Sequence, residues 1–283
     1  MKKQISCILK NLVRYVLYLL VLLIIMFPIY WVASMSIKTF ADIIRFPPVF
    51  IFTPTFENYY SIFAYTLAAG EMPPFIRYVL NSCIISGGAV ALSLLLGLPA
   101  AYALTRSNSK GNQRMAFTFM SYRFAPELMV ILPLFRIFMS LGLYDTYRGM
   151  ILIHQLLTLP LIIWIMMGSF REMPKDLENA AKIDGANPWQ TFAKIMLPIA
   201  KPSIGSATII AFIFSWNNLL FGLILSGGRT RAATMGILQT MTFDQIRWGE
   251  MAAFAMVAAI PGFIIAVFCQ RFLVKGLTMG AMK

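Results

Sequence analysis

Charge is scarce in this sequence. Only 12% of its 283 residues are charged, 59% are hydrophobic, and the mean hydropathy is +0.74. Soluble domains carry roughly 25% charged residues, so the composition argues against a soluble protein and predicts an all-α membrane protein. At roughly 20 residues per span plus loops, the length allows about six transmembrane helices in a single domain.

The residue types that bind metals and carry covalent chemistry are also few. There is one histidine, and three cysteines, Cys7, Cys83 and Cys269, lie far apart. This spacing argues against a zinc site and against a disulfide framework. The chain contains no Gly-Lys pair, which the phosphate-binding loop of an ATPase requires. We therefore expect a protein that is not an enzyme and that binds no cofactor or metal itself.

Acidic residues are outnumbered, 11 against 24 Lys and Arg, for a net charge of +13. Because the basic residues stand between apolar runs, the excess indicates membrane topology rather than nucleic-acid binding. With six spans, about twice as many Lys and Arg fall on the side of the two termini, which the positive-inside rule assigns to the cytoplasm. The first apolar run is longer than the core of a signal peptide, so we interpret it as a retained span.

Apolar runs predict the six spans, and between the first two lies an aromatic-rich loop, residues 38–74. We interpret that loop as an interfacial lid, with a contact surface for an extracytoplasmic partner as the alternative. Small residues recur every fourth position in the second run and predict close helix packing there. The predicted spans are residues 14–37, 75–104, 115–141, 147–169, 203–226 and 250–270, followed by a tail at 271–283.

The longest polar interval in the later part of the chain, residues 171–202, has the pattern of two short helices. Gly185 suits a left-handed cap at the end of the first helix. Asn187 suits the amino-terminal cap of the second, with Pro188 at its first position, and Pro198 is expected to end it. The interval is either a loop that covers its own helix bundle or a docking surface. Small residues after Leu177, on the same predicted face, would let another surface approach closely; they are Ala180 and Ala181.

The same interval resembles the permease subunits of binding-protein-dependent ABC importers. Their pattern is Glu-Ala-Ala, three residues, Gly, nine residues, Ile, one residue, Leu-Pro. It corresponds here to Asn179-Ala180-Ala181, Gly185, Ile195 and Leu197-Pro198. The triplet Asp184-Gly185-Ala186 is similar to the carbohydrate branch, and in particular to the smaller maltose-type subunit. Asn179 occupies the acidic position of the pattern, and Glu178, one residue earlier, is the candidate to replace that charge.

The resemblance implies a type I ABC importer permease fold in the bacterial plasma membrane, with six helices and both termini cytoplasmic. It implies a homologous permease partner, two ATPase subunits that use ATP and Mg, and an extracytoplasmic solute-binding protein. The expected solute is a sugar, oligosaccharide or polyol, with glycerol phosphate as the alternative. The loop 174–198 would couple to an ATPase through Glu178, Asn179, Ala180, Ala181, Asp184, Gly185, Ala186, Ile195, Leu197 and Pro198.

Charged and polar side chains inside a membrane are energetically costly, and where they occur they usually serve a function. The polar residues inside the predicted spans are therefore candidates for the solute pathway. Arg123 and Glu127 stand four residues apart and could pair, although Arg123 could instead extend to the cytoplasmic surface. Trp216, Asn217 and Asn218 interrupt the fifth run. The asparagines either line the pathway or form hydrogen bonds between helices.

Two other classes of protein remain open from the sequence. A secondary transporter or channel would use acidic residues inside the spans, and Glu127 is the one carboxylate well inside a predicted span. A membrane scaffold would have no use for intramembrane Arg, Glu and Asn. Dependence of uptake on ATP separates an ABC permease from a secondary transporter.

Overall fold

The computed structural model describes residues 2–64, 74–106, 110–121, 126–241 and 246–280. Among these residues the regular elements are helices, as the composition predicts. They form two compact units, one made of residues 1–75 and 237–258 and the other of residues 76–236 and 259–283.

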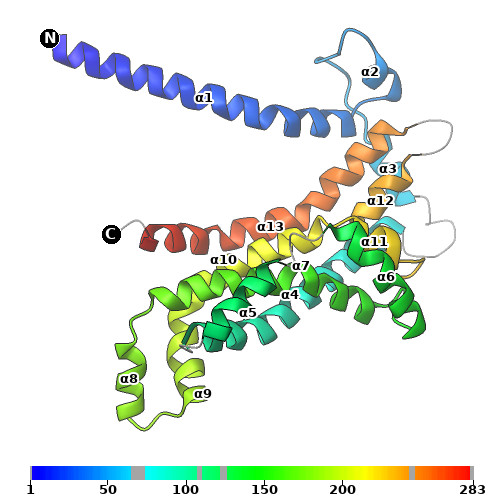
Figure 1. The fold of residues 1–283 in the computed structure, drawn as a ribbon. Helices are drawn as coiled ribbons and strands as arrows, with labels where there is room; N and C mark the ends of the chain where they lie inside the picture. The colour runs from blue at the N-terminus through cyan, green and yellow to red at the C-terminus, as the bar shows by residue number, and fades with distance from the viewer. Residues whose placement is uncertain (1, 65–73, 107–109, 122–125, 242–245, 281–283) are drawn as a thin grey trace. The chain divides into compact units, whose positions relative to one another are not determined.

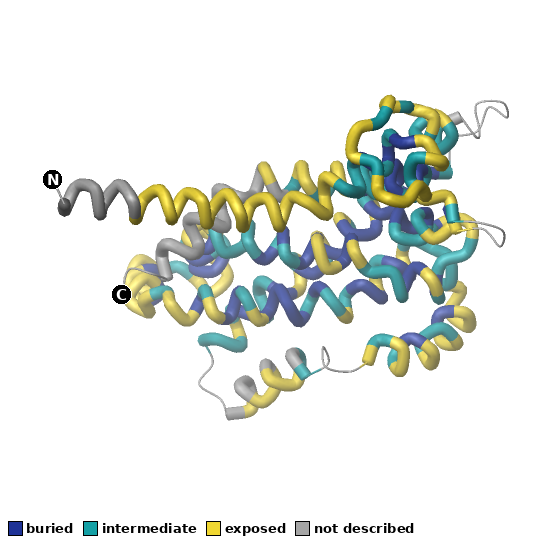
Figure 2. Tube along the Cα trace, turned by 90° about the horizontal axis from the view of Figure 1, so that it is seen from above, coloured by how far each residue is buried: buried dark blue, intermediate teal, exposed yellow. Residues whose placement is uncertain are grey.

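The first unit contains α1 (Lys2–Ser36), α2 (Phe40–Ile44), α3 (Glu57–Ala64) and the start of α13 (Trp248–Gly280). The residues of α1 are exposed from Lys10 to Tyr30 (Figure 2), and most of them are apolar. The aromatic loop folds onto the end of α1. The Tyr59 hydroxyl lies 2.9 Å from the Ser36 hydroxyl, and the buried Lys38 ammonium donates to the Val49 carbonyl at 2.6 Å. Lys38 also lies over the rings of Trp31 and Phe52.

The second unit is a helical bundle in which the most extensive packing joins α7 and α10 (Figure 1). Its helices follow in the order α4 (Pro74–Arg106), α5 (Lys110–Ser121), α6 (Glu127–Ser140), α7 (Tyr147–Glu172), α8 (Asp176–Ile183), α9 (Pro188–Thr191), the π-helical turn η2 (Phe192–Met196), α10 (Leu197–Trp216), α11 (Leu220–Leu225), the start of α12 (Ala233–Gln239) and the part of α13 that follows Ala258.

The small-residue stripe of α4 packs against α7, as predicted. Ala89, Ser93 and Ala101 are fully buried, and the Ser93 hydroxyl lies 2.6 Å from that of Thr158. A Cβ atom at Gly97 would lie 3.0 Å from Ile162 Cγ2. Small side chains therefore set the distance between these two helices.

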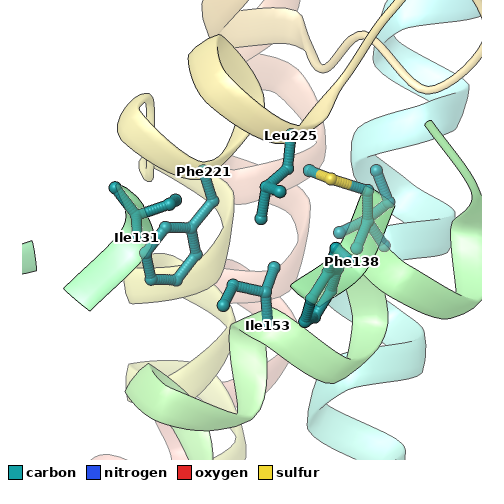
Figure 3. Close-up of a cluster of buried hydrophobic side chains, with 7 residues drawn as sticks. Ile131, Phe138, Ile153, Phe221 and Leu225 are labelled. Carbon is teal, nitrogen blue, oxygen red and sulfur yellow. The ribbon is translucent and has the colours of Figure 1, made fainter. Parts of the chain in front are cut away.

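A second group of contacts closes the other end of this unit (Figure 3). Side chains from four helices meet there, from α4, α6, α7 and α11. They are Ile85, Ile131, Phe138, Met150, Ile153, Phe221 and Leu225. The cluster attaches the short helices α6 and α11 to the long ones, because burial of large aliphatic and aromatic groups is the main stabilising term in packing.

Five helices in the described part of the chain are long and apolar enough to cross a membrane. They are Lys10–Ser36, Pro74–Arg106, Tyr147–Glu172, Pro188–Trp216 and Trp248–Ile265. The prediction of one continuous helix over 115–141 was wrong, since Pro126 has ψ 121°, outside the helical region, and α6 begins at Glu127. Proline lacks an N–H group and its ring is poorly accommodated inside a helix, so a break at Pro126 is expected.

The predicted fifth span was also misplaced. One helical stretch runs from Pro188 to Trp216, and α11 follows as a separate helix. Pro198 therefore does not end the second short helix. It is the second residue of α10, where a missing N–H is tolerated, and it follows directly after the wider π-helical turn η2. At the other end of the chain, α13 continues to Gly280 through most of the predicted tail.

Candidate functional site

The polar interval forms a helical hairpin, α8 and α9, at the ends of α7 and α10 (Figure 1). Gly185 has φ +82°, the left-handed region that glycine adopts without strain. The Gly185 N–H donates to the Lys182 carbonyl at 3.1 Å, and the Ala186 N–H donates to the Ala181 carbonyl at 2.9 Å. These two bonds are a Schellman motif, so the predicted bend at Gly185 is confirmed.

A capping box begins the second half of the hairpin. The Asn187 side chain accepts from the Gln190 N–H at 2.8 Å, and the Gln190 side chain accepts from the Asn187 N–H at 2.9 Å. Pro188 stands at the first helical position, as expected. Both orphan donors are satisfied locally, so the hairpin holds its shape without help from a partner.

The hairpin has an exposed face and a buried face. Asn179, Ala180, Asp184, Gly185 and Pro198 are exposed, and Ala186, Ile195 and Leu197 are partly buried. Glu178 and Ala181 are buried, at 8% and 3% exposure. Ala180 therefore shares an exposed face with Leu177, whereas Ala181 contacts its own chain. Leu177, Ala180 and Ala181 therefore do not form the single face that was predicted, because Ala181 is buried and the other two are exposed.

Glu178 forms an ion pair with Arg106, the last residue of α4. The side chains are only 13% and 10% exposed, and Arg106 Nη2 also donates to the Met173 carbonyl at 3.2 Å. Tyr102, one turn earlier on α4, interacts with the same carboxylate. The sequence did not indicate this pairing, because the two residues are far apart in the chain and Arg106 looked like an ordinary basic residue at the end of a span.

Aromatic rings fill the space between α4 and the base of the hairpin. Tyr102 lies 5.5 Å from Phe170 of α7 and 5.1 Å from Phe192 of η2, centroid to centroid, and Trp189 of α9 lies 5.4 Å from Phe192. Aromatic contacts at these distances stabilise beyond simple area burial. The hairpin is thus packed against α4 as well as joined to α7 and α10.

The polar residues predicted to line a pathway are only partly brought together. The Asn218 amide donates to the Glu127 carboxylate at 3.0 Å, and its Oδ1 atom accepts from the Phe221 N–H at 3.0 Å. Arg123 lies outside the described residues, so its predicted pairing with Glu127 stays a prediction. Asn218, from the segment between α10 and α11, is the partner that the structure provides.

Trp216 and Asn217 lie apart from that pair. Trp216 is 7% exposed and stacks on Phe212 at 5.5 Å, so it belongs to the packed interior. Asn217 is exposed at the carboxyl-terminal cap of α10. The single histidine, His154, is buried, bonded through Nδ1 to the Met150 carbonyl at 2.7 Å and packed on Phe221, so it is a packing residue.

Asp145, in the turn before α7, organises the loop after α11 and was missed by sequence reasoning. Its carboxylate accepts from the N–H groups of Arg229 and Thr230 at 3.0 and 2.9 Å and from the Thr230 hydroxyl at 2.8 Å. Burial alone would raise the pKa of Asp145, but these donors hold it below its usual value. Asn81 adds bonds to the carbonyls of Arg229 and Arg231, at 3.0 and 2.8 Å.

A metal centre is not built by the residues that the structure describes, which contain no group of three or more His, Cys, Asp or Glu side chains able to hold an ion. The features left for function are therefore a preformed surface hairpin, an ion pair behind it, and a carboxylate–amide pair at a helix break.

The fold defines a multi-pass helical membrane protein with a preformed surface hairpin between two of its long helices. The chain belongs to the family described as "Binding-protein-dependent transport system inner membrane component", whose model matches residues 93–279. Among its relatives, the trehalose transport system permease protein SugB of Mycobacterium tuberculosis is 35% identical over 261 residues, 90% of this chain and 92% of that protein.

Two further comparisons agree with that assignment. The trehalose/maltose transport system permease protein MalG of Thermococcus litoralis is 30% identical over 280 residues and covers 98% of both chains. A solved bacterial ABC transporter involved in import of the polysaccharide alginate has a TM-score of 0.73 at 22% identity, covering 94% of this chain and 97% of that chain. This structural likeness shows that the chain has the fold of an ABC importer permease.

Proposed function

We propose that this chain forms half of the translocation pathway of an ATP-driven carbohydrate importer in the bacterial inner membrane. It pairs with a homologous permease, two ATPase subunits and an extracytoplasmic solute-binding protein. The choice of carbohydrate is supported by the names of relatives, which are permeases for trehalose, trehalose/maltose and diacetylchitobiose. ATP and Mg are used by the partners, since this chain has no Gly-Lys pair for a phosphate-binding loop.

The observation that carries the proposal is the preformed hairpin α8–α9 with its exposed small face. Gly185 and the Asn187 capping box fix its shape, and Ala180 presents a side chain small enough for close approach. A surface element that is shaped in advance loses little conformational entropy on docking. We assign it to a cleft of the ATPase.

Coupling follows from the continuity of one helix. The chain is helical from Pro188 in the hairpin to Trp216, 29 residues, which corresponds to roughly 40 Å at 1.5 Å per residue. The helix ends one residue before the segment that holds Asn218 against Glu127. A displacement of the hairpin by the ATPase would therefore move the polar pair as part of a rigid body.

Glu127 and Asn218 suit a carbohydrate. A carboxylate accepts hydrogen bonds, and an amide both donates and accepts them, which matches the hydroxyl groups of a sugar. The pair is partly buried at a break between helices, where polar groups in a membrane protein are tolerated when they line a cavity. Solute hydroxyls would exchange with the Asn218–Glu127 bond during passage.

Co-purification and uptake test the proposal together. The tagged chain, expressed with its neighbouring genes, is expected to retain a second permease and an ATPase. Vesicles holding that complex should accumulate radiolabelled trehalose or maltose when the binding protein and ATP are both present. Ala180→Trp should remove the ATPase while the second permease stays bound, because Ala180 is exposed. Accumulation driven by an ion gradient without ATP would instead show a secondary transporter.

A matched variant separates docking from folding. Ala181→Trp places the same large ring one residue further along α8, at a side chain that is 3% exposed. Overpacking of a filled site destabilises by about 1–3 kcal/mol. It should therefore lower the thermal stability and membrane level of the chain, whereas Ala180→Trp should leave both unchanged.

A further inference from the structure

We propose that the Arg106–Glu178 ion pair is an internal strut that holds the hairpin at a fixed position on α4, and that Glu178 does not contact the ATPase. The inference rests on the proposed function and deepens it by assigning the transmitting contact. Both are positioning residues, since they act through the exposed face of the hairpin. The family pattern would place an acid at position 179, and here the acid stands one residue earlier.

Burial is the first argument. Glu178 is 8% exposed, whereas its neighbours Asn179 and Ala180 are exposed. The carboxylate thus faces the chain's own helices. A buried charge is tolerated when it is paired, and Arg106 supplies the opposite charge. An outward ion pair with another subunit would need the Glu178 side chain to leave this position and leave Arg106 buried without its partner.

The second argument is connectivity: the ion pair attaches α4 to a hairpin that is already joined covalently to α7 and α10. The hairpin is joined covalently to α7 and α10, while α4 ends at Arg106. Arg106 forms an ion pair with Glu178 in the first turn of α8 and donates a hydrogen bond to the Met173 carbonyl just before α8. These contacts attach α4 to the hairpin at two points, so α4 must move with α8.

The helices next to the ion pair are closely packed. Tyr102 packs between Phe170 and Phe192, and α4 packs on α7 through Ser93 and Gly97. Close-packed interiors transmit displacement rather than absorb it. Force applied to the exposed face of α8 would therefore reach α4 through an ion pair and reach α10 through the continuous chain.

The strut is tested in the full chain within its purified transporter complex, in a background with Cys7, Cys83 and Cys269 replaced by serine. Spin labels at Lys182 on α8 and Ala103 on α4, both exposed, report the distance between the two helices. The parent should show one narrow distance, the same without nucleotide and with ATP, Mg and vanadate. Glu178→Ala and Arg106→Ala should broaden it and lower ATP-driven uptake of the carbohydrate about fivefold or more, as expected for loss of a coupling contact.

The double variant Arg106→Ala/Glu178→Ala distinguishes a strut from a merely structural pair. Each single change strands one buried charge, whereas the double change removes both. Thermal stability should therefore recover in the double variant, while the broad distance and the low uptake persist. Glu178→Asp should keep a narrow distance and most of the uptake. The matched control is Asp176→Ala, which removes an exposed carboxylate from the same turn of α8 and should change neither measurement.

Three results would overturn the strut while leaving the proposed function intact. One is loss of ATPase co-purification in Glu178→Ala, which would place Glu178 at the docking contact. Another is recovery of uptake together with stability in the double variant. The third is an equal defect in Asp176→Ala. Failure of the parent chain to retain an ATPase, with uptake independent of ATP, would instead refute the proposed function itself.

Discussion

The amide of Asn218 donates a 3.0 Å hydrogen bond to the carboxylate of Glu127, joining the first residue of α6 to the break between α10 and α11. The two residues are 91 positions apart in the chain. The bond is partly buried. It links α6, which begins directly after Pro126, to the carboxyl-terminal end of α10, the helix that continues from the hairpin. Under the proposed function, it is the point where hairpin movement would alter the environment of the solute.

Replacements at Asn218 should lower uptake to an extent that depends on the charge of the new side chain. Asn218→Ala removes the donor and leaves a partly buried carboxylate with one bond fewer, which costs about 1–3 kcal/mol. Asn218→Asp places a second carboxylate against Glu127, so like charges add repulsion to the lost bond. We expect uptake to fall more in Asn218→Asp than in Asn218→Ala at equal membrane levels. Arg136→Ala, at an exposed position of the same α6, is the control with parent uptake, and equal defects in both Asn218 variants would contradict the pairing.

Substitution of Gly185 should act through the backbone alone. Its φ is +82°, and nothing lies within 4 Å of the position that a Cβ would take. A left-handed conformation costs most residues about 1–2 kcal/mol, and Asn less. Gly185→Val should therefore weaken ATPase co-purification and uptake with normal insertion, whereas Gly185→Asn should retain both. If Gly185→Val behaves like the parent in both assays, the bend is not required for docking.

The loop after α11 should depend on pH through Asp145. Donors from Arg229 and Thr230 lower the pKa of Asp145, so the folded state favours the carboxylate. Its stabilising effect is complete well above the unfolded value of about 3.9 and is lost as pH falls through the lower folded value. The difference in unfolding temperature between the parent and Asp145→Asn should stay constant from about pH 5 to 8 and shrink below about pH 4.

The asparagine variant isolates the charge at Asp145. Asn tolerates the positive φ of 52° found at this position. However, its NH2 group replaces one carboxylate oxygen, so the N–H group of Arg229 or Thr230 loses its acceptor. Hydrogen exchange of the Arg229 and Thr230 amides at neutral pH should accelerate in Asp145→Asn. Glu172→Gln, an exposed carboxylate at the end of α7, is the control. Unchanged protection in Asp145→Asn would show that the carboxylate does not hold this loop.

Two glycines of α4 should respond in opposite ways to an added side chain. A Cβ at Gly97 would lie 3.0 Å from Ile162, whereas one at Gly87 would meet nothing within 4 Å. Gly97→Val should destabilise the chain by about 1–3 kcal/mol through overpacking. Gly87→Ala should be neutral or stabilise by roughly 0.5–1 kcal/mol, since glycine in a helix is unfavourable. Unfolding of the purified chain in detergent measures both, and equal effects would refute the packing of α4 on α7.

Local sequence signals predicted the parts of the fold that depend on neighbours in the chain. Gly185, Asn187 and Pro188 predicted the hairpin, because caps and turns are set by hydrogen bonds within a few residues. The stripe from Ala89 to Ala101 predicted a packed face. Proline was less predictable. Pro198 does not end its helix, because it occupies the first turn of α10 directly after a π-helical turn.

Local sequence patterns could not predict which face of the hairpin is buried and which is exposed. Leu177, Ala180 and Ala181 share one side of an isolated helix, yet Ala181 is buried and Ala180 is exposed. Which side is covered depends on where α4 lies, and no pattern within residues 171–202 specifies that. The same holds for Trp216, which looked like a pathway residue and is packed on Phe212.

The sequence by itself determined the class of this protein, since low charge, long apolar runs and the spaced Ala-Ala, Gly and Leu-Pro residues are local properties of the chain. Only the tertiary structure decided the partners of its charges. Arg106 meets Glu178, Asn218 meets Glu127 and Asp145 meets Arg229 and Thr230 across long stretches of sequence. A buried polar group requires a partner, but which one it finds depends on helix packing that brings distant segments together.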